Sequence, residues 1–288
     1  MHIRTRRLLS IAAVRGPRGR CWRSLLFLAL LPLLLAACGQ SDSAGLTVTG
    51  STSVAPFAEH LAELYQHAHA GTAINIQSLG SSAGIQAAID GVAEIGMSSR
   101  ELKPEEADKL DELVIARDAL AVIVHPANPV SKLSLKQVQD IFSGSVRSWS
   151  ALGGPEQPID LVIREAGSGT AGAFDELVMK GKAITITALR QGSNGAIRQV
   201  VAENPNAIGY ISLGIVDNTV KALAINNVAP SVAHVEAGTY TFVRPFLFVW
   251  RKGHTFSPLA RQYIDYVMSA EGQQELQNLG LVKGPASP

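Results

Sequence analysis

Residues 46–68 read LTVTGSTSVAPFAEHLAELYQHA, and this stretch decides the fold. It begins with a short β-rich run, Leu46–Thr49, and ends with Val54–Ala68, where apolar residues recur at the spacing of an amphipathic helix. Between them lies a loop of glycine and small hydroxyl residues, Thr49-Gly50-Ser51-Thr52-Ser53. A strand that leads through such a loop directly into a helix is a building unit of α/β proteins. We therefore expect an α/β fold.

The alternation of strands and helices continues along the chain. Further predicted strands are Ala73–Ser78, Glu94–Met97, Leu113–Ala116, Leu120–His125, Ile159–Ile163 and the long β-branched and aromatic run Tyr240–Trp250. Predicted helices are Gly84–Ile89, Pro104–Leu110, Leu135–Phe142, Thr170–Val178, Ala196–Ala202, Pro258–Met268 and Gln273–Leu279. The pattern is long enough for a second α/β unit in the middle of the chain.

Two more strand-to-helix junctions have the composition of the first loop: Gly80-Ser81-Ser82-Ala83-Gly84 and Gly167-Ser168-Gly169-Thr170. A helix N-terminus presents unpaired N–H groups and a partial positive charge, and glycine lets the backbone approach an anion closely. Each loop alone is explained by helix capping, which is the commonest role of Ser and Thr at such positions. Three such loops in one α/β frame favour a shared anion site.

Arg164 precedes the third loop, in the sequence Arg164-Glu165-Ala166-Gly167. Its guanidinium is a planar fork of donors that can bind two oxygens of one anion. The alternative is an ion pair at the protein surface.

The first 37 residues predict an export signal. They contain seven arginines and no acidic residue, followed by the apolar run Leu25–Leu35. That run is too short to span a bilayer, which takes about 20 residues, and it ends in the small-residue sequence Leu35-Ala36-Ala37-Cys38. LAAC resembles a bacterial lipobox, which implies that Cys38 becomes the lipid-modified N-terminus and that residues 38–45 form a tether. The alternative is an ordinary signal peptide with a chance cysteine.

The composition of residues 38–288 excludes several classes of function. Cys21 and Cys38 are the only cysteines, so no internal disulfide can form once residues 1–37 are removed. Removal of the seven arginines leaves 18 basic against 24 acidic residues, a net charge of −6. Nucleic-acid binding through a basic patch is therefore not expected. Neither a metal-ligand motif nor a Walker sequence occurs, so we expect no cofactor.

Five motifs in order resemble the phosphate-binding proteins of bacterial ABC transporters: TGSTSVAP (49–56), LGSSAG (79–84), EIGMSSREL (94–102), REAGSGT (164–170) and AIGYISLG (207–214). The resemblance covers essentially all of residues 46–282. It implies binding of inorganic phosphate and delivery to membrane permease subunits by an exported, lipid-anchored monomer that is not an enzyme. The phosphate-binding residues that it implies are Thr52, Ser53, Ser81, Ser99, Arg100, Arg164, Ser168, Gly169 and Thr170.

The resemblance also implies a two-lobed fold of the type II periplasmic-binding-protein kind, with two hinge crossings and the ligand in the cleft between the lobes. The crossings are expected near Ala121–His125 and Tyr240–Val249. Lobe one would then consist of residues 46–122 and 243–288, and lobe two of residues 123–242. A ligand that contacts both lobes would favour the closed form.

The third motif departs from the best-known family pattern at Ser99, where an aspartate would accept the proton of the bound phosphate. A serine hydroxyl can accept or donate. Discrimination against sulfate is therefore weakened, although other members with SSREL keep phosphate as the leading ligand. Arg100 either adds charge to the site or pairs with Glu101 or Glu105 outside it.

Three alternative functions remain open. The site could take another tetrahedral oxyanion, such as sulfate, molybdate or tungstate. The binding module could serve a sensor or an adhesin instead of a transporter. Finally, Gly80-Ser81-Ser82-Ala83-Gly84 fits the G-x-S-x-G elbow of a serine esterase, with Ser82 as nucleophile, Asp217, and His234 or His254.

Overall fold

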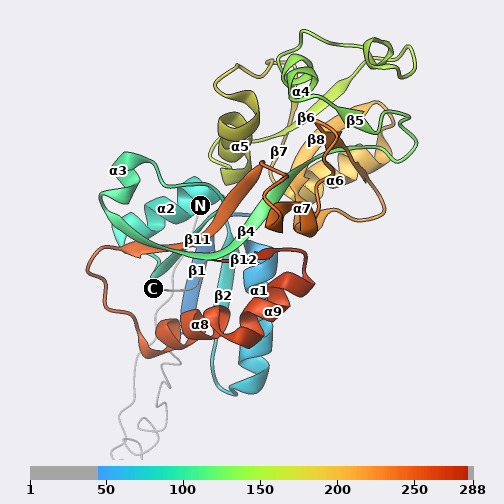
Figure 1. Cartoon of the computed structure of the whole chain (residues 1–288). Coiled ribbons are helices and arrows are strands. Elements are labelled where there is room, and N and C mark those ends of the chain that lie inside the picture. The colour runs from blue at the N-terminus through green and yellow to red at the C-terminus, as the bar shows by residue number, and fades with distance from the viewer. Residues whose placement is uncertain (1–44, 285–288) are drawn as a thin grey trace, which may run out of the picture. The chain divides into compact units, whose positions relative to one another are not determined.

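The computed structural model describes residues 45–284, so the predicted signal peptide, Cys38 and most of the tether lie outside the described residues. One sheet path runs through this part of the chain in the order β2-β1-β3-β11-β4-β8-β6-β7, and β12 and β9 also pair with β4. The central strand is β4 (Leu110–Val124). Helices flank the sheet along its length (Figure 1), which confirms the predicted α/β class.

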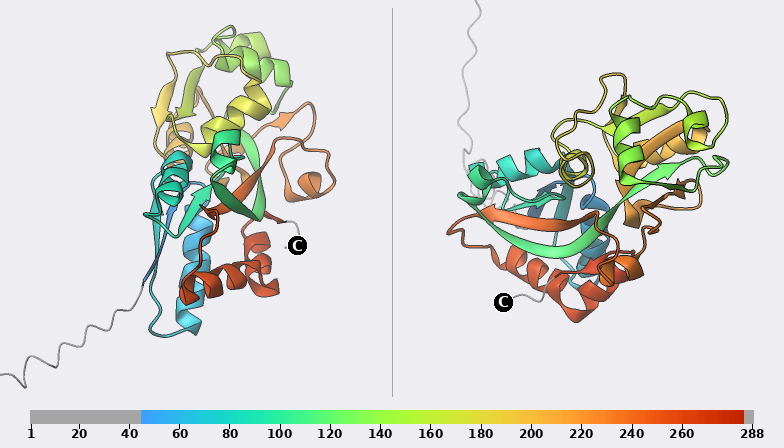
Figure 2. Two further views of the ribbon diagram at one scale, coloured as in Figure 1. Left: turned by 90° about the vertical axis from the view of Figure 1, so that its left-hand side faces the viewer. Right: turned by 45° about the horizontal axis from the view of Figure 1, so that its top comes forward.

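The strands on one side of β4 come from both ends of the described chain, and we call them the β1 half: β1 (Leu46–Gly50), β2 (Ile74–Ser78), β3 (Ile95–Ser98), β11 (Val243–Arg251) and β12 (Val282–Lys283). Their helices are α1 (Ala55–Ala68), α2 (Ser81–Asp90), α3 (Pro104–Ala107), α8 (Pro258–Met268) and α9 (Ala270–Asn278). The blue start and red end of the chain lie together here in all views (Figures 1 and 2). One apolar core, centred on Phe57, Phe246 and Tyr263, joins them.

The middle of the chain forms the other side, the β6 half, with β6 (Asp160–Arg164), β7 (Leu189–Gln191), β8 (Ala207–Ser212) and β9 (Lys221–Ala222). Its helices are α4 (Leu135–Phe142), α5 (Gly169–Phe174, continued as a π-helical turn to Met179), α6 (Asn194–Glu203) and α7 (Val232–Glu236). A small ribbon of β5 (Lys132–Leu133) and β10 (Ala224–Ile225) lies beside it. A second apolar core, distinct from that of the β1 half, fills this half.

β4 links the two halves as one continuous strand. Its residues 110–119 pair with β11, and its residues 120–124 pair with β8. The prediction of two separate strands, Leu113–Ala116 and Leu120–His125, was therefore wrong. The strand continues through the charged pair Arg117-Asp118, because Asp118 is buried and lies opposite Arg244 of β11 in the strand register.

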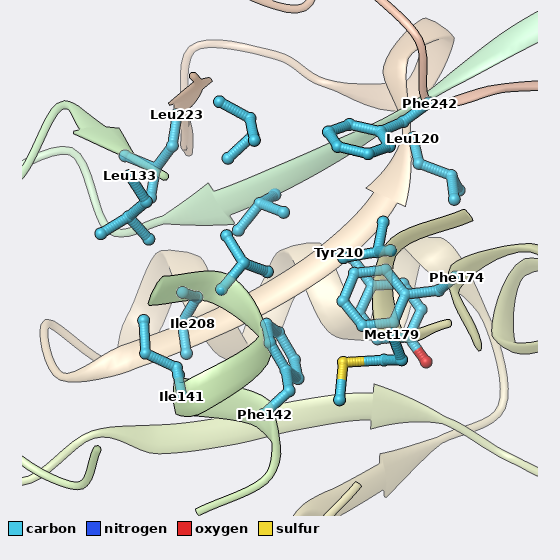
Figure 3. Close-up of a cluster of buried hydrophobic side chains, with 14 of the residues drawn as sticks. Leu120, Leu133, Ile141, Phe142, Phe174, Met179, Ile208, Tyr210, Leu223 and Phe242 are labelled. Carbon is cyan, nitrogen blue, oxygen red and sulfur yellow. The ribbon is translucent and has the colours of Figure 1, made fainter. Parts of the chain in front are cut away.

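An aromatic stack fixes α5 on the sheet of the β6 half (Figure 3). The rings of Phe174 and Tyr210 are parallel with their centroids 3.7 Å apart, and Phe142 packs edge-on against Phe174 at 4.8 Å. All three side chains are fully buried. Since α5 begins only five residues before Phe174, this packing determines where its N-terminus lies.

Candidate anion-binding site

The three glycine- and serine-rich loops lie at the carboxyl ends of strands, as predicted. The first follows β1, the second lies between β2 and α2, and the third follows β6. In open α/β sheets, ligands bind at the carboxyl ends of the strands. The backbone N–H of Ser82 donates to the carbonyl of Gly167 at 3.1 Å, so the second and third loops meet across the boundary between the two halves.

Hydroxyl groups of the first two loops and of the β3 end form one buried cluster. Ser51 Oγ donates to Ser99 Oγ at 2.9 Å, and the Ser99 N–H donates to Ser81 Oγ at 3.1 Å. Ser51, Ser81 and Ser99 are each no more than 1% exposed. Buried hydroxyls can accept or donate, which suits them to an anion whose oxygens carry a variable number of protons.

The N-terminus of α5 lies directly against this cluster. A methyl group placed on Gly169 would lie 2.5 Å from Ser99 Oγ and closer still to Ser81 Oγ. Ser168 caps the helix through its Oγ, which accepts the Ala171 N–H at 3.3 Å. Thr170 Oγ1 lies 2.6 Å from Ser53 Oγ of the first loop. Residues of the two halves are thus in hydrogen-bond contact.

Arg164 is fully buried and connects the halves. Its NH2 donates to Thr52 Oγ1 at 2.8 Å, and its Nε and NH2 form a two-pronged pair with Glu165. Its remaining nitrogen, NH1, faces Thr170 Oγ1 at 3.5 Å. Arg164 does form an ion pair, but not one at the protein surface. Its own side chain is 0% exposed, and only its partner Glu165 is partly exposed, at 35%.

A second buried arginine, Arg244 of β11, reaches the same hydroxyl, although no sequence motif indicated it. Its Nε and NH2 donate to Asp118 Oδ2 at 2.9 and 2.8 Å, while NH1 donates to Thr170 Oγ1 at 2.8 Å. The NH1 groups of Arg164 and Arg244 therefore converge on one hydroxyl. Two guanidiniums repel one another at this range, so their convergence favours an anion between them.

Burial is the largest influence on the pKa values of Arg244 and Asp118. Burial raises the pKa of the Asp118 carboxyl, while Arg244 and the Ser212 hydroxyl oppose the rise. Burial likewise lowers the pKa of Arg244, Asp118 opposes this, and the nearby charge of Arg164 adds to the lowering. Both Asp118 oxygens are engaged, Oδ2 by Arg244 and Oδ1 by Ser212 at 2.8 Å. The ion pair with Asp118 therefore fixes the orientation of the Arg244 guanidinium, so that NH1 points to the Thr170 hydroxyl.

Asn194, at the start of α6, is a further site residue that was not predicted from the sequence. Its Nδ2 donates to Ser53 Oγ at 2.7 Å, and the side chain is buried. Just before it, the carbonyls of Gln191 and Gly192 accept from Arg164 at 3.3 and 3.1 Å. The only sequence signal was the helix-start pattern Gly192-Ser193-Asn194.

Arg100 lies beside the cluster but is engaged elsewhere. It forms a two-pronged pair with Glu106 at 2.7 and 2.9 Å, rather than with Glu101 or Glu105, and NH1 also donates to the carbonyl of Glu101. Its aliphatic part packs against α5, where a methyl group on Gly172 would lie 3.0 Å from Arg100 Cδ.

The hydrogen bonds do not favour the esterase alternative. Asp217 pairs with Arg198 and Thr219, His254 with Glu94, and His234 Nδ1 with the carbonyl of Ala229. Among residues 45–284, no hydrogen bond links Ser82 to any of these side chains. The same part of the chain contains no group of three His, Cys, Asp or Glu side chains placed to hold a metal ion.

Comparison with known proteins supports the fold and the family. Residues 36–271 match the model of the PBP superfamily domain. A putative phosphate ABC transporter substrate-binding protein with bound phosphate from Clostridium perfringens is 41% identical, with a TM-score of 0.80, over 83% of this chain and 99% of that one. An ABC-type phosphate transport receptor from Vibrio cholerae is 35% identical, with a TM-score of 0.70, over 82% and 99%.

A curated relative agrees with these structures. The phosphate-binding protein PstS of Pseudomonas aeruginosa PAO1 is 30% identical over 286 residues, which cover 89% of this chain and 87% of the relative. The predicted two-lobed, periplasmic-binding-protein-like fold is thereby confirmed. The chain belongs to the PBP superfamily and, within it, to the family of phosphate-binding proteins that serve ABC transporters.

Proposed function

We propose that this chain binds inorganic phosphate outside the cytoplasm and delivers it to the permease of an ABC importer. The observation that carries the proposal is the convergence of two buried guanidiniums, Arg164 and Arg244, on Thr170 amid buried hydroxyls. The names of the relatives, which describe a phosphate-binding protein and a putative phosphate ABC transporter substrate-binding protein with bound phosphate, support this choice of anion.

In this proposal Arg164 and Arg244 supply the positive charge, and hydroxyl groups from both halves bind the ligand oxygens. Thr52, Ser53, Ser81 and Ser99 would act from the β1 half. Ser168, Gly169 and Thr170 would act from the β6 half through the start of α5. Since Arg100 is paired with Glu106 and packs on α5, we assign it to contact between the halves rather than to the ligand.

Binding would close the cleft between two lobes, for which we propose residues 46–122 with 243–288 and residues 123–242. The hydrogen bonds Thr52–Arg164 and Ser53–Thr170 span this division and support a closed form. An anion that contacts both lobes stabilises the closed form by its higher affinity for it.

We further propose that Cys38 carries the lipid that anchors the exported protein and that the chain acts as a monomer. The LAAC sequence supports the anchor. Among residues 45–284 the longest helix has 14 residues, and none has the length and apolarity that a bilayer crossing needs.

Titration calorimetry on the unlipidated protein tests the function. We expect phosphate and arsenate to bind more tightly than sulfate, molybdate or tungstate. Preferential binding of molybdate or tungstate would replace the ligand in this proposal, and no heat with any of the five anions would overturn it. Loss of phosphate uptake after deletion of the gene would separate transport from a sensor or adhesin role.

A further inference from the structure

Asn194 contacts the hydroxyl cluster of the candidate site through one end of its amide, and the other end has no hydrogen-bond partner. The side chain is 1% exposed, and its Nδ2 donates to Ser53 Oγ at 2.7 Å. Ser53 Oγ is in turn 2.6 Å from Thr170 Oγ1, the atom on which both arginines converge. The amide is therefore linked to each guanidinium by three successive hydrogen bonds, through the hydroxyls of Ser53 and Thr170.

The Oδ1 atom of Asn194 has no hydrogen-bond partner, although it is buried. Among the side chains of residues 45–284, only this atom and the hydroxyl of Tyr266, on α8, are buried without a partner. Buried polar atoms are almost always paired, so this unpaired acceptor beside the hydroxyl cluster is open to a partner that a bound ligand can supply.

Other strong acceptors near the cluster are already occupied. Both carboxylate oxygens of Asp118 accept from Ser212 and Arg244, and both of Glu165 accept from Arg164. The carbonyl of Ser99 accepts from Arg244 NH1 at 3.2 Å. Donors dominate, because two guanidiniums and several hydroxyls face the same point.

A ligand that carries a proton therefore needs an acceptor, and Asn194 offers one. We propose that Asn194 Oδ1 accepts the O–H of a protonated tetrahedral oxyanion and thereby selects phosphate over sulfate. An amide oxygen cannot donate, so sulfate, which has no proton near neutral pH, would leave it buried and unpaired. This inference rests on the proposed function of the site. It assigns to Asn194 the proton-accepting role that an aspartate at the position of Ser99 has in the best-known family pattern.

The test compares phosphate, arsenate and sulfate affinities at pH 8 for the parent, Asn194→Leu and Asn194→Asp. In Asn194→Leu we expect phosphate and arsenate to weaken at least tenfold while sulfate stays equal or tightens. Asn194→Asp keeps an acceptor, so it should preserve or widen the phosphate-to-sulfate ratio. Ser193→Ala is the matched control, because it removes the neighbouring cap of α6, where Ser193 Oγ accepts the Ala196 N–H, without touching the amide.

Thermal unfolding establishes that each variant folds. If Asn194→Leu weakens sulfate as much as phosphate, the amide presents its NH2 end to the ligand and the inference is wrong. If Asn194→Leu does not fold, a reduced ratio in Asn194→Asp overturns the inference, and a preserved or wider one supports it. A parent that does not bind phosphate would instead refute the proposed function, whereas a parent that excludes sulfate by the same ratio as Asn194→Leu would refute only the role of Asn194.

Discussion

Each arginine of the site binds a carboxylate through Nε and NH2, and its remaining nitrogen, NH1, faces the Thr170 hydroxyl. Glu165 holds Nε and NH2 of Arg164, and Asp118 holds Nε and NH2 of Arg244. Lysine could not reproduce this arrangement, because its ammonium is a single point charge. Each carboxylate offsets part of the charge of its arginine and fixes the guanidinium, so that the two NH1 groups meet at one point.

Arg164→Ala should fold and lose most of its phosphate affinity, by about 2–5 kcal/mol, because a desolvated charge contact is removed. Arg164→Lys should recover only part of the loss. Calorimetry with phosphate measures both variants. An unchanged affinity in Arg164→Ala would show that the anion binds elsewhere.

Arg244 serves both stability and binding, and a double variant separates the two. Arg244→Met should lower the free energy of unfolding by about 3–5 kcal/mol, because it leaves the Asp118 carboxylate buried without its partner. Adding Asp118→Leu should restore stability, since replacing a buried ion pair by apolar residues is often neutral. Phosphate affinity should stay low in the double variant. Denaturant unfolding and calorimetry measure the two quantities, and recovered affinity would exclude Arg244 from the ligand.

The sequence predicted Arg164 but neither Arg244 nor Asn194, for a physical reason. Arg164 stands next to the glycine-rich loop with which it acts. Arg244 contacts Thr170 from 74 residues away, and it lies in a run, Tyr240–Trp250, whose composition indicates a buried strand. Asn194 contacts Ser53 across 141 residues. Such contacts follow from the order of strands in the sheet, which local patterns do not encode.

Helices and strands were predicted best from the sequence where apolar residues recur with a clear period. The helix Leu135–Phe142 was predicted with its observed bounds, and Ser134 caps it. The strand β8 was quoted as a motif but not predicted as a strand, and the short strands β5, β7, β9, β10 and β12 were not predicted. These short strands exist only because neighbouring strands offer hydrogen bonds, which is a property of the whole sheet.

The start of α5 should tolerate no side chain at Gly169. Gly169→Ala would push a methyl group into Ser81 and Ser99, so we expect phosphate affinity to fall at least tenfold, about 1.4 kcal/mol. Stability without ligand should change little, because alanine favours the helix. Gly195→Ala is the control, since its methyl group would meet only Ser193 Oγ at 3.8 Å. Equal affinities of the two variants would show that the halves need not approach this closely.

For the whole molecule, the anchor is predicted to depend on one residue outside the described part of the chain. Cys38→Ser should yield a protein that carries no lipid and is no longer retained by the membrane. Metabolic labelling with a fatty-acid analogue, followed by membrane fractionation, checks this. Labelling of the variant as strong as that of the parent would refute the lipobox interpretation.

Closure of the two halves should depend on the anion, because the contacts between them bring Arg164 and Arg244 together. The hydrogen bond Ser53–Thr170 contributes only about 0.5–1.5 kcal/mol, and Thr52–Arg164, which involves a charged group, about 1.5–3 kcal/mol. Repulsion between two buried guanidiniums opposes both. We therefore expect the ligand-free protein to populate an open form, and phosphate to reduce its radius of gyration in X-ray scattering. Phosphate at 100 times its Kd should also raise the free energy of unfolding by about 2.7 kcal/mol. Arg164→Ala at the same phosphate concentration is the control and should show smaller changes in both quantities, because its affinity for phosphate is lower. A parent that binds phosphate with an unchanged radius of gyration would mean that the halves are already closed without the anion, and that the convergence of the two arginines is stable on its own.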